Sequence, residues 1–305
     1  MINGEWELIS KSVKNPSKNK GHIIKVACIL AYFKGSKFLK DQIQSIIDQD
    51  NEDIFITLFI SDDYSQEKFP SLKDLNFRNF GKINIFYRSL KINNGYTQNF
   101  LSTLNLIESD FDYFCFSDQD DIWNKNKINR SIQILRKFKN NKPSLYFGRT
   151  DYFNENCSTK IGTSTLFKKK PSFKNAIIQN MAGGNTMLFN KSAKEIITSL
   201  NFLDVVSHDW FCYQIVSGIG GNIYYDHKPC LKYRQHNSNI LGSNNKLSDR
   251  VVRFKKLFNG HLKDWNEKNI YALNAHRTFL TEQNRLVLDN FKLASKSPFF
   301  QRIFL

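Results

Sequence analysis

The sequence has few cysteines, and none of them is spaced like a structural or metal-binding pair. Its five cysteines are an odd number, they are widely separated, and no C-x-x-C pair occurs among the 305 residues. Disulfide frameworks and zinc knuckles both have characteristic cysteine spacings. The sequence therefore suggests neither, and it fits a reducing cytoplasm.

Long apolar runs are also missing. No uninterrupted apolar stretch approaches the roughly 18 residues that would span a bilayer, and residues 1–22 lack an apolar core of signal-peptide length. The G-x-x-x-x-G-K-[ST] loop that cradles phosphates does not occur either. We therefore expect a cytoplasmic protein that is not integral to a membrane, and in which diphosphate binding depends on a metal ion and side chains.

Acidic residues are the scarcer charged type. Against 44 Lys and Arg stand 28 Asp and Glu, which leaves a formal net charge of +16. A net positive charge of this size is compatible with three kinds of partner, namely nucleic acid, an anionic membrane face or a negatively charged substrate. A basic nucleic-acid-binding protein is thus one alternative, but it would need clustered Lys and Arg interleaved with aromatics, or a recognisable binding motif. The sequence has neither, so we expect no nucleic acid partner.

Strand-like and helix-like stretches alternate in the first half of the chain. With 41% hydrophobic residues the chain can build a core. Continuous β-prone runs predict strands at 25–31, 54–60, 83–87 and 112–117. Apolar side chains at helical spacing predict one helix containing residues 38–47 and another over 97–107. This alternation indicates βαβ units, so the predicted fold class is α/β with a doubly wound, mostly parallel sheet flanked by helices.

The second half of the chain is less regular. We predict a helix at about 124–139, strands near 145–147 and 186–190, and helices near 191–200 and 208–217. The chain is then divided into a loosely attached basic N-terminal extension (1–24), a catalytic domain (25–245) and a helical, basic C-terminal region (246–305).

Polar side chains follow the predicted parallel strands at the point where each strand ends. Tyr32 follows the first strand, Asp62 and Asp63 follow the second, and the sequence Asp-Gln-Asp-Asp at 118–121 follows the fourth. Ligands of such sheets bind beyond the carboxyl ends of the strands. Two acidic clusters are therefore expected to meet at one rim of a basic protein.

The 118–121 cluster is the stronger of the two signals. Its three carboxylates repel one another unless a cation or hydrogen-bond donors neutralise them. Mg²⁺ and Mn²⁺ prefer such oxygen ligands and complete their shells with phosphate oxygens and water. The alternative is a solvated acidic turn that caps the next helix. Asp62 and Asp63 are candidates for contacts to a nucleoside, or they form an ordinary turn.

Six ordered motifs give these residues a family context. They are ACILAYFKGSKFLKDQIQSIIDQ, FISDDYS, NNGYTQNF, FSDQDDIW, SHDW and YRQHNSNILG. Together they make residues 25–242 resemble family 2 glycosyltransferases of the GT-A fold. The likeness is strongest to bacterial rhamnosyltransferase-like members that build surface polysaccharides.

The resemblance implies a role for each matching position. Asp209 would be the catalytic base, and the metal ligands would be Asp118, Asp120 and His236. The implied nucleotide-binding residues are Tyr32, Asp62, Asp63, Asn94, Gly95 and Asp118. The implied contacts to donor and acceptor are Asp121, Trp123, Gly184, Asn185, His208, Trp210 and Arg234.

Each of these roles has a structural alternative. Asp209 with Ser207 could cap the helix that follows. His208 and Trp210 have the residue types of ordinary core side chains, and Arg234 and His236 could be plain loop residues. Gly95 and Gly184 permit close backbone approach, but each could belong to a simple turn.

The resemblance implies an inverting, metal-dependent transfer of a sugar from a nucleotide diphosphate donor. Such a reaction needs one base at the acceptor hydroxyl and one Lewis acid at the leaving diphosphate. The donor it suggests is dTDP-L-rhamnose, with a UDP-hexose or a UDP-N-acetylhexosamine as alternatives. The acceptor would be a saccharide or a polyprenyl-linked saccharide in O-antigen or capsule synthesis. A nucleotidyltransferase, which would release pyrophosphate, is a further alternative.

The C-terminal region mixes cations with apolar residues, notably at 250–258 and 296–305. One interpretation is an interfacial helix that contacts an anionic membrane peripherally, at the inner face of the cell membrane. The other is a helix that packs on the catalytic domain and leaves a basic face in solvent.

Overall fold

The structure is a computed structural model, and it describes residues 5–12, 23–50, 53–79, 82–108, 110–138, 141–200, 204–236 and 262–295. The strands are β1 (Glu7–Ser10), β2 (Ile24–Tyr32), β3 (Ile54–Asp62), β4 (Asn84–Ser89), β5 (Tyr113–Ser117), β6 (Ile122–Trp123), β7 (Ser144–Phe153), β8 (Lys160–Thr163), β9 (Leu188–Asn190) and β10 (Asn222–Arg234). The helices are α1 (Ser36–Ile47), α2 (Gly95–Leu106), α3 (Lys127–Leu135), α4 (Phe173–Ala176), α5 (Lys191–Ser199), α6 (His208–Gly218), α8 (Leu262–Ala275) and α9 (Glu282–Ser295), with 3₁₀ turns at Gly184–Thr186 and Arg277–Phe279.

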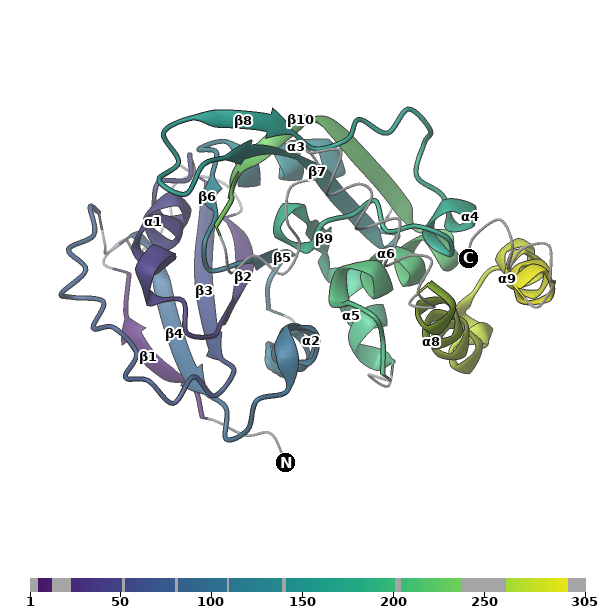
Figure 1. Cartoon of the computed structure of the whole chain (residues 1–305), viewed down its shortest axis with the longest axis horizontal. Coiled ribbons are helices and arrows are strands. Elements are labelled where there is room, and N and C mark those ends of the chain that lie inside the picture. The colour runs from purple at the N-terminus through teal and green to yellow at the C-terminus, as the bar shows by residue number, and fades with distance from the viewer. Residues whose placement is uncertain are drawn as a thin grey trace.

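One mixed sheet organises these elements (Figure 1). The strand order is β1-β4-β3-β2-β5-β9-β7-β10-β6, and β8 pairs with β7. The strands β4, β3, β2 and β5 are parallel neighbours, as are β7 and β10. The short strand β9 joins the two parallel parts, because it runs antiparallel to both β5 and β7. The four strands predicted in the first half of the chain are all present.

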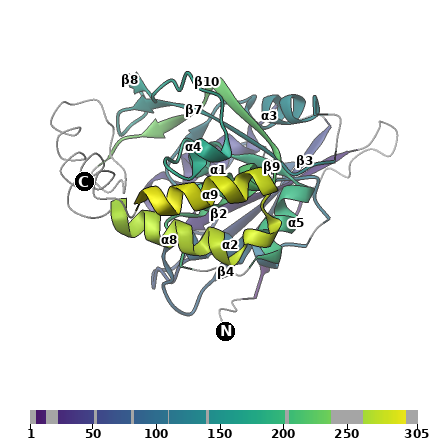
Figure 2. The ribbon, with the colours of Figure 1, turned by 90° about the vertical axis from the view of Figure 1, so that its right-hand side faces the viewer.

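Helices cover both faces of the sheet, as the doubly wound prediction requires. On one face, Leu39, Ile43 and Ile46 of α1 pack with Ile128 and Ile132 of α3 in one apolar cluster. On the other face, apolar residues of α2, α5 and α6 form a second cluster, which also takes in buried residues of α8 and α9. Figure 2 shows α8 and α9 as an outer pair on this second face.

The N-terminal segment differs from the loosely attached extension that we predicted. Strand β1 pairs antiparallel with β4 at the edge of the sheet. Trp6 holds it there, because its ring lies 5.2 Å from the ring of Phe59 and 4.8 Å from the guanidinium of Arg88. Too few apolar residues surround Trp6 in the sequence for this strand to be predicted. The proposed division of the chain at residues 24 and 245 stays a prediction.

Strand β10 is the main element that the sequence pattern missed. Pro229 and the charged residues around it interrupt the alternation of apolar side chains. The strand accommodates them through register shifts against β7 between Asp226 and Leu231. Because β10 ends at Arg234, this strand brings the YRQH motif to the site.

The C-terminal region is helical in the part that the structure describes. Both α8 and α9 pack on the second face, which agrees with the interpretation of a helix packed on the domain. The stretches at 250–258 and 296–305, on which the membrane interpretation was based, lie outside the described residues. Among the described residues, no helix is long and apolar enough to cross a membrane.

Candidate active site

The carboxyl ends of four parallel strands meet at one edge of the sheet. Tyr32 at the end of β2 is in register with Asp62 at the end of β3, and Asp62 is in register with Ser89 at the end of β4. On the other side of β2, Ser117 at the end of β5 pairs with Leu30. The loops after β2, β3 and β5 therefore emerge side by side, as the sequence predicted.

Negative charge gathers where β5 ends. Burial, followed by the nearby charges of Asp120 and Asp209, raises the pKa of Asp118 to about 7. Asp121 is fully buried, and burial together with Asp118 and Asp120 raises its pKa well above the ordinary value. The structure thus brings the D-x-D motif and Asp209 into one site, although Asp120 and Asp209 are 89 residues apart.

His236 and Arg234 approach the D-x-D loop from β10. Nε2 of His236 lies 2.9 Å from Oδ2 of Asp120, so these two predicted metal ligands are neighbours. Arg234 is only 2% exposed, and its Nε donates to the backbone oxygen of Asp120 at 2.8 Å while Nη2 donates to Asp41 at 2.9 Å. The guanidinium of Arg234 therefore holds the D-x-D backbone, and its expected contact to donor or acceptor stays a prediction.

The Gly184-Asn185 turn links the acidic loop to the predicted base. Nδ2 of Asn185 donates to Oδ2 of Asp121 at 2.6 Å, and the backbone N–H of Gly184 donates to Oδ2 of Asp209 at 3.1 Å. A Cβ atom at Gly184 would lie 2.4 Å from Nε2 of His208, so only glycine permits this approach. The Gly184-Asn185 turn therefore fixes the spacing of two carboxylates, and its predicted close approach to a ligand stays a prediction.

Asp209 lies in the first turn of α6. Its Oδ1 accepts hydrogen bonds from Ser207 Oγ at 2.5 Å and from the backbone N–H of Trp210 at 2.7 Å. Ser207 makes no side-chain cap to the helix backbone. The helix-capping alternative thus gives way to a different arrangement, in which serine and backbone donors orient the carboxylate of Asp209.

The aspartates after β3 organise loops. Asp62 is 1% exposed and accepts from Ser65 N, Ser65 Oγ and the hydroxyl of Tyr87. Asp63 is 3% exposed, and its Oδ1 accepts from the backbone N–H of Asn94 at 2.8 Å. Asp63 therefore joins this loop to Asn94 and Gly95, where Gly95 opens α2 with a left-handed φ of 77°. The oxygens of Asp62 have local donors in this structure, and its expected nucleoside contact stays a prediction.

Four predicted aromatic or imidazole contacts lie in the core instead of at the rim. Tyr32 is 1% exposed and packs on Phe69, and Trp210 is 5% exposed and donates to the backbone oxygen of Ala176. His208 is stacked on Phe100 at 4.2 Å. Trp123 is 3% exposed, and its ring lies 3.5 Å from the buried amine of Lys127. These side chains therefore belong to the core in this structure, and the ligand contacts that we expected from them stay predictions.

The rim carries aromatic residues that the sequence analysis did not single out. Phe33 follows β2 and is 43% exposed, and Tyr64 follows β3 and is 39% exposed. Tyr96 lies at the start of α2 and is 42% exposed. Asp209 and Asp118 both raise the pKa of Tyr96, after burial as the first cause, so its hydroxyl is near the acidic site. Each of the three directly follows a residue that we did select in the sequence. This adjacency was the signal that could have identified them as site residues.

Gln119, the variable residue of the D-x-D motif, was also missed. Its Oε1 accepts from the backbone N–H of Phe33 at 2.9 Å and its Nε2 donates to the oxygen of Phe33 at 3.1 Å. The side chain lies directly over Gly35, where an added Cβ would be 2.1 Å from Cδ of Gln119. Gln119 thereby clamps the D-x-D loop to the loop after β2.

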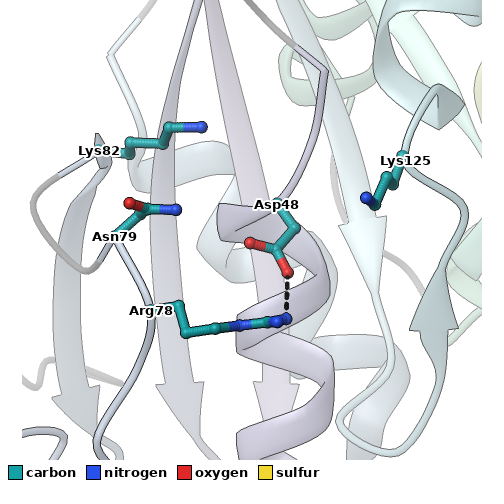
Figure 3. A pocket seen from close by; sticks show the side chains of 5 residues that line it. All are labelled: Asp48, Arg78, Asn79, Lys82 and Lys125. Atoms are coloured by element: carbon teal, nitrogen blue, oxygen red, sulfur yellow. Dashed lines mark hydrogen bonds and ion pairs between the residues drawn. The ribbon is translucent and has the colours of Figure 1, made fainter.

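A separate hollow lies at the opposite end of the sheet (Figure 3). It is lined by Asp48, Arg78, Asn79, Lys82 and Lys125. Asp48 follows α1 and Lys82 precedes β4, so this hollow is at the amino ends of the strands. It contains none of the residues discussed above.

Comparison with known proteins shows the family of this chain. The family model described as "Glycosyl transferase family 2" matches residues 27–197, which is more than half of the chain. The chain belongs to glycosyltransferase family 2. The matched range contains the strands β2 to β5, the D-x-D motif and the Gly184-Asn185 turn.

A curated relative and two solved structures extend this result. The chain is 30% identical over 238 residues to the dTDP-rhamnosyl transferase RfbG of Shigella flexneri, covering 70% of this chain and 74% of the relative. TarS 1–349 of S. aureus matches with a TM-score of 0.52 at 12% identity, over 88% of this chain and 92% of that one. Its complex with UDP-GlcNAc matches with a TM-score of 0.52 at 14% identity, over 88% and 79%. The fold is GT-A, and the protein is a glycosyltransferase similar to a rhamnosyltransferase.

Replacing Gln119 tests the clamp. Gln119→Met keeps the side-chain length but removes both hydrogen bonds to Phe33. We expect kcat/KM for sugar transfer to fall about 30-fold, which corresponds to a loss of about 2 kcal/mol of transition-state stabilisation. Gln283→Met, a change at an exposed position of α9, serves as the control. Equal activity of the two variants would show that the clamp has no part in catalysis.

The buried His208 predicts a pH-dependent stability. Burial lowers its pKa to about 4 from the ordinary value of 6.5. Between pH 6.5 and about pH 4, the unfolded chain therefore binds a proton at His208 more readily than the folded chain does. The stability that comes from keeping His208 neutral in the folded state is lost as the pH falls through this range. We expect the free energy of unfolding of the wild type, measured against that of His208→Phe, to fall by about 2 kcal/mol between about pH 7.5 and pH 5. Urea unfolding of both proteins measures it, and a difference that stays constant with pH would contradict it.

Proposed function

We propose that this glycosyltransferase inverts the anomeric centre of a nucleotide-activated sugar, uses a divalent cation, and has Asp209 as its base. The observation that carries the proposal is the juxtaposition of Asp209 with Asp118 and Asp120. The Gly184-Asn185 turn joins the acidic loop to Asp209, through hydrogen bonds of 2.6 Å to Asp121 and 3.1 Å to Asp209. Burial and then the charges of Asp120 and Asp209 raise the pKa of Asp118, which agrees with this proximity. The D-x-D end of the site suits the donor and the Asp209 end suits the acceptor.

The residues beside the D-x-D motif fit a divalent cation. Asp120 and His236 supply a carboxylate and an imidazole 2.9 Å apart, and Mn²⁺ and Mg²⁺ accept such ligands to different degrees. Among the described residues no group of three or more His, Cys, Asp or Glu side chains is arranged as a metal site. The donor diphosphate and water would therefore complete the ligand set. When bound, the ion would neutralise charge on the leaving diphosphate.

The excess of negative charge supports the same conclusion. Asp118 has its pKa raised to about 7 by burial and by its carboxylate neighbours. A cation held by Asp120 and His236 would relieve this repulsion and favour the ionised form of Asp118. The site is therefore better suited to a bound cation than to carboxylates alone.

Asp209 is arranged to accept a proton. Ser207 and the backbone of Trp210 bind Oδ1, and the Gly184 N–H binds Oδ2, so the carboxylate has a fixed direction. In the transfer, the acceptor hydroxyl oxygen forms a bond to the anomeric carbon while the bond from that carbon to the diphosphate breaks. The hydroxyl proton passes to Asp209. This single displacement inverts the configuration at the anomeric carbon.

The curated relative supports dTDP-L-rhamnose as the donor. The protein RfbG of Shigella flexneri is named as a dTDP-rhamnosyl transferase. The solved TarS complex contains UDP-GlcNAc, so a UDP-linked sugar is the second candidate. A saccharide or a polyprenyl-linked saccharide of a bacterial surface polysaccharide is the proposed acceptor, and the protein would meet such an acceptor at the inner face of the membrane.

Asp209→Asn tests the base. The amide keeps the shape of the side chain but cannot take the proton, so we expect kcat for transfer to fall by about 10²- to 10⁴-fold. Donor binding, followed by thermal shift, should be retained. Asp204→Asn, at an exposed carboxylate shortly before α6, is the matched control. Near-normal turnover by Asp209→Asn would remove it from the role of base.

Asp120→Ala tests the cation site. Ligands that bind the native state raise its apparent stability, by about 2.7 kcal/mol at a hundredfold excess over Kd. We expect dTDP-L-rhamnose with Mn²⁺ to stabilise the wild type in a thermal-shift assay, and EDTA or Asp120→Ala to abolish most of that shift. UDP-glucose and UDP-GlcNAc measure donor choice in the same assay. Asp74→Ala, on an exposed loop, is the control. A donor shift that is indifferent to EDTA would contradict the metal requirement.

A further inference from the structure

Residues 160–180, here called the lysine segment, stand apart in composition. These 21 residues contain five lysines and no Asp or Glu. Lys168, Lys169, Lys170 and Lys174 are exposed. Among the described residues, no carboxylate lies within ion-pair distance of these four, whereas Lys160 pairs with Asp151 at 2.7 Å. The segment therefore presents positive charge that the folded domain does not neutralise.

The three consecutive lysines project from a short bridge that is fixed at both ends. Before them, the backbone N–H of Phe167 donates to the hydroxyl of Tyr225 at 3.3 Å. After them, the N–H of Ser172 donates to the hydroxyl of Tyr213 at 3.2 Å. Both tyrosine rings pack on Phe147, with centroids 5.4 and 5.5 Å from it. The placement of Lys168, Lys169 and Lys170 at the surface is thus set by the core.

Aliphatic side chains are exposed beside this charge. Ile161, Leu166 and Ile178 are 46%, 45% and 46% exposed. Aliphatic groups can enter the acyl boundary of a membrane while neighbouring cations contact the head groups. A nucleic acid would instead favour exposed aromatic platforms and arginines between the cations, and this segment offers no arginine.

The segment is also tied to the helix that carries the proposed base. The indole N–H of Trp210 donates to the backbone oxygen of Ala176 at 2.6 Å, and Nε2 of Gln214 donates to the same oxygen at 3.3 Å. Trp210 directly follows Asp209. Figure 2 shows α4, which lies within the segment, on the face that also carries α8 and α9. A surface held by residues 160–180 would therefore lie on the Asp209 side of the molecule.

We propose that the lysine segment is the surface through which the protein docks on an anionic phospholipid membrane. Lysines bind the phosphate head groups, and Leu166 and Ile178 enter the acyl boundary. The purpose of this contact rests on the proposed function, since docking would bring a lipid-linked acceptor close to Asp209. The membrane contact itself does not depend on that function. Its location differs from the C-terminal stretches that sequence composition suggested.

Vesicle binding by the full chain tests the proposal without donor or acceptor. The wild type is co-sedimented with vesicles of phosphatidylcholine, alone or mixed with phosphatidylglycerol. The test variant is Lys168→Glu/Lys169→Glu/Lys170→Glu. The control is Lys40→Glu/Lys68→Glu/Lys73→Glu, which makes the same change of net charge at exposed lysines elsewhere.

We expect the wild type to bind the anionic vesicles, the test variant to bind them at least about tenfold more weakly, and the control to bind within about twofold of the wild type. Leu166→Ser/Ile178→Ser should also weaken binding, and inorganic pyrophosphate should not displace the protein. Absence of wild-type binding, or equal loss in test variant and control, would overturn the proposal, as would unchanged binding of the test variant. Transfer to a water-soluble acceptor should be unchanged in the lysine variant, so a failure here is distinct from a failure of Asp209→Asn.

Discussion

Repulsion between carboxylates at the end of β5 is the constraint around which the site is built. Parallel strands deliver their carboxyl ends to one edge, and this edge receives Asp118, Asp120 and Asp121 from a single loop and Asp209 from α6. Such a cluster is stable only if donors or a cation neutralise it. The surrounding structure supplies hydrogen-bond partners from three segments, which are the Gly184-Asn185 turn, the start of α6 and the end of β10. The proposed cation and its diphosphate would supply the rest.

Those donors also make the site rigid. Gln119 fastens the acidic loop to the backbone of Phe33, Arg234 fastens its main chain from β10, and Asn185 fastens Asp121. Gly184 adds a bond to Asp209, so the acidic loop and the proposed base share one turn. Geometry of this kind is what a transfer between two bound sugars requires, because reacting atoms must be held near their attack distance. Several residues with predicted ligand contacts turn out to act in this way, by holding others in place.

The exposed lysines of the lysine segment are separate from the acidic site. The lysine segment concentrates exposed cations beside the helix of Asp209, while the D-x-D loop concentrates carboxylates at the strand ends. A basic protein with an acidic centre can thus bind a metal and a nucleotide sugar inside while it contacts an anionic surface outside. The two charge distributions serve different partners of the same proposed reaction.

Apolar periodicity in the sequence determined the first half of the fold, because buried parallel strands and their helices have strong local patterns. It also placed Asp118 and Asp120 at the ligand-binding edge, since both follow a buried strand, whereas Asp209 was selected only through the family resemblance. Local pattern could not reveal β10, whose Pro229 is absorbed by register shifts, or β1, whose attachment depends on Trp6 meeting Arg88 across the sheet. Nor could it separate Tyr32, Trp210 and His208 in the core from Phe33 and Tyr96 at the rim, because burial is decided by elements far apart in the chain. The tertiary structure alone decided that Arg234 and Gln119 hold the acidic loop, since each of these hydrogen bonds joins segments that become neighbours only when the sheet is complete.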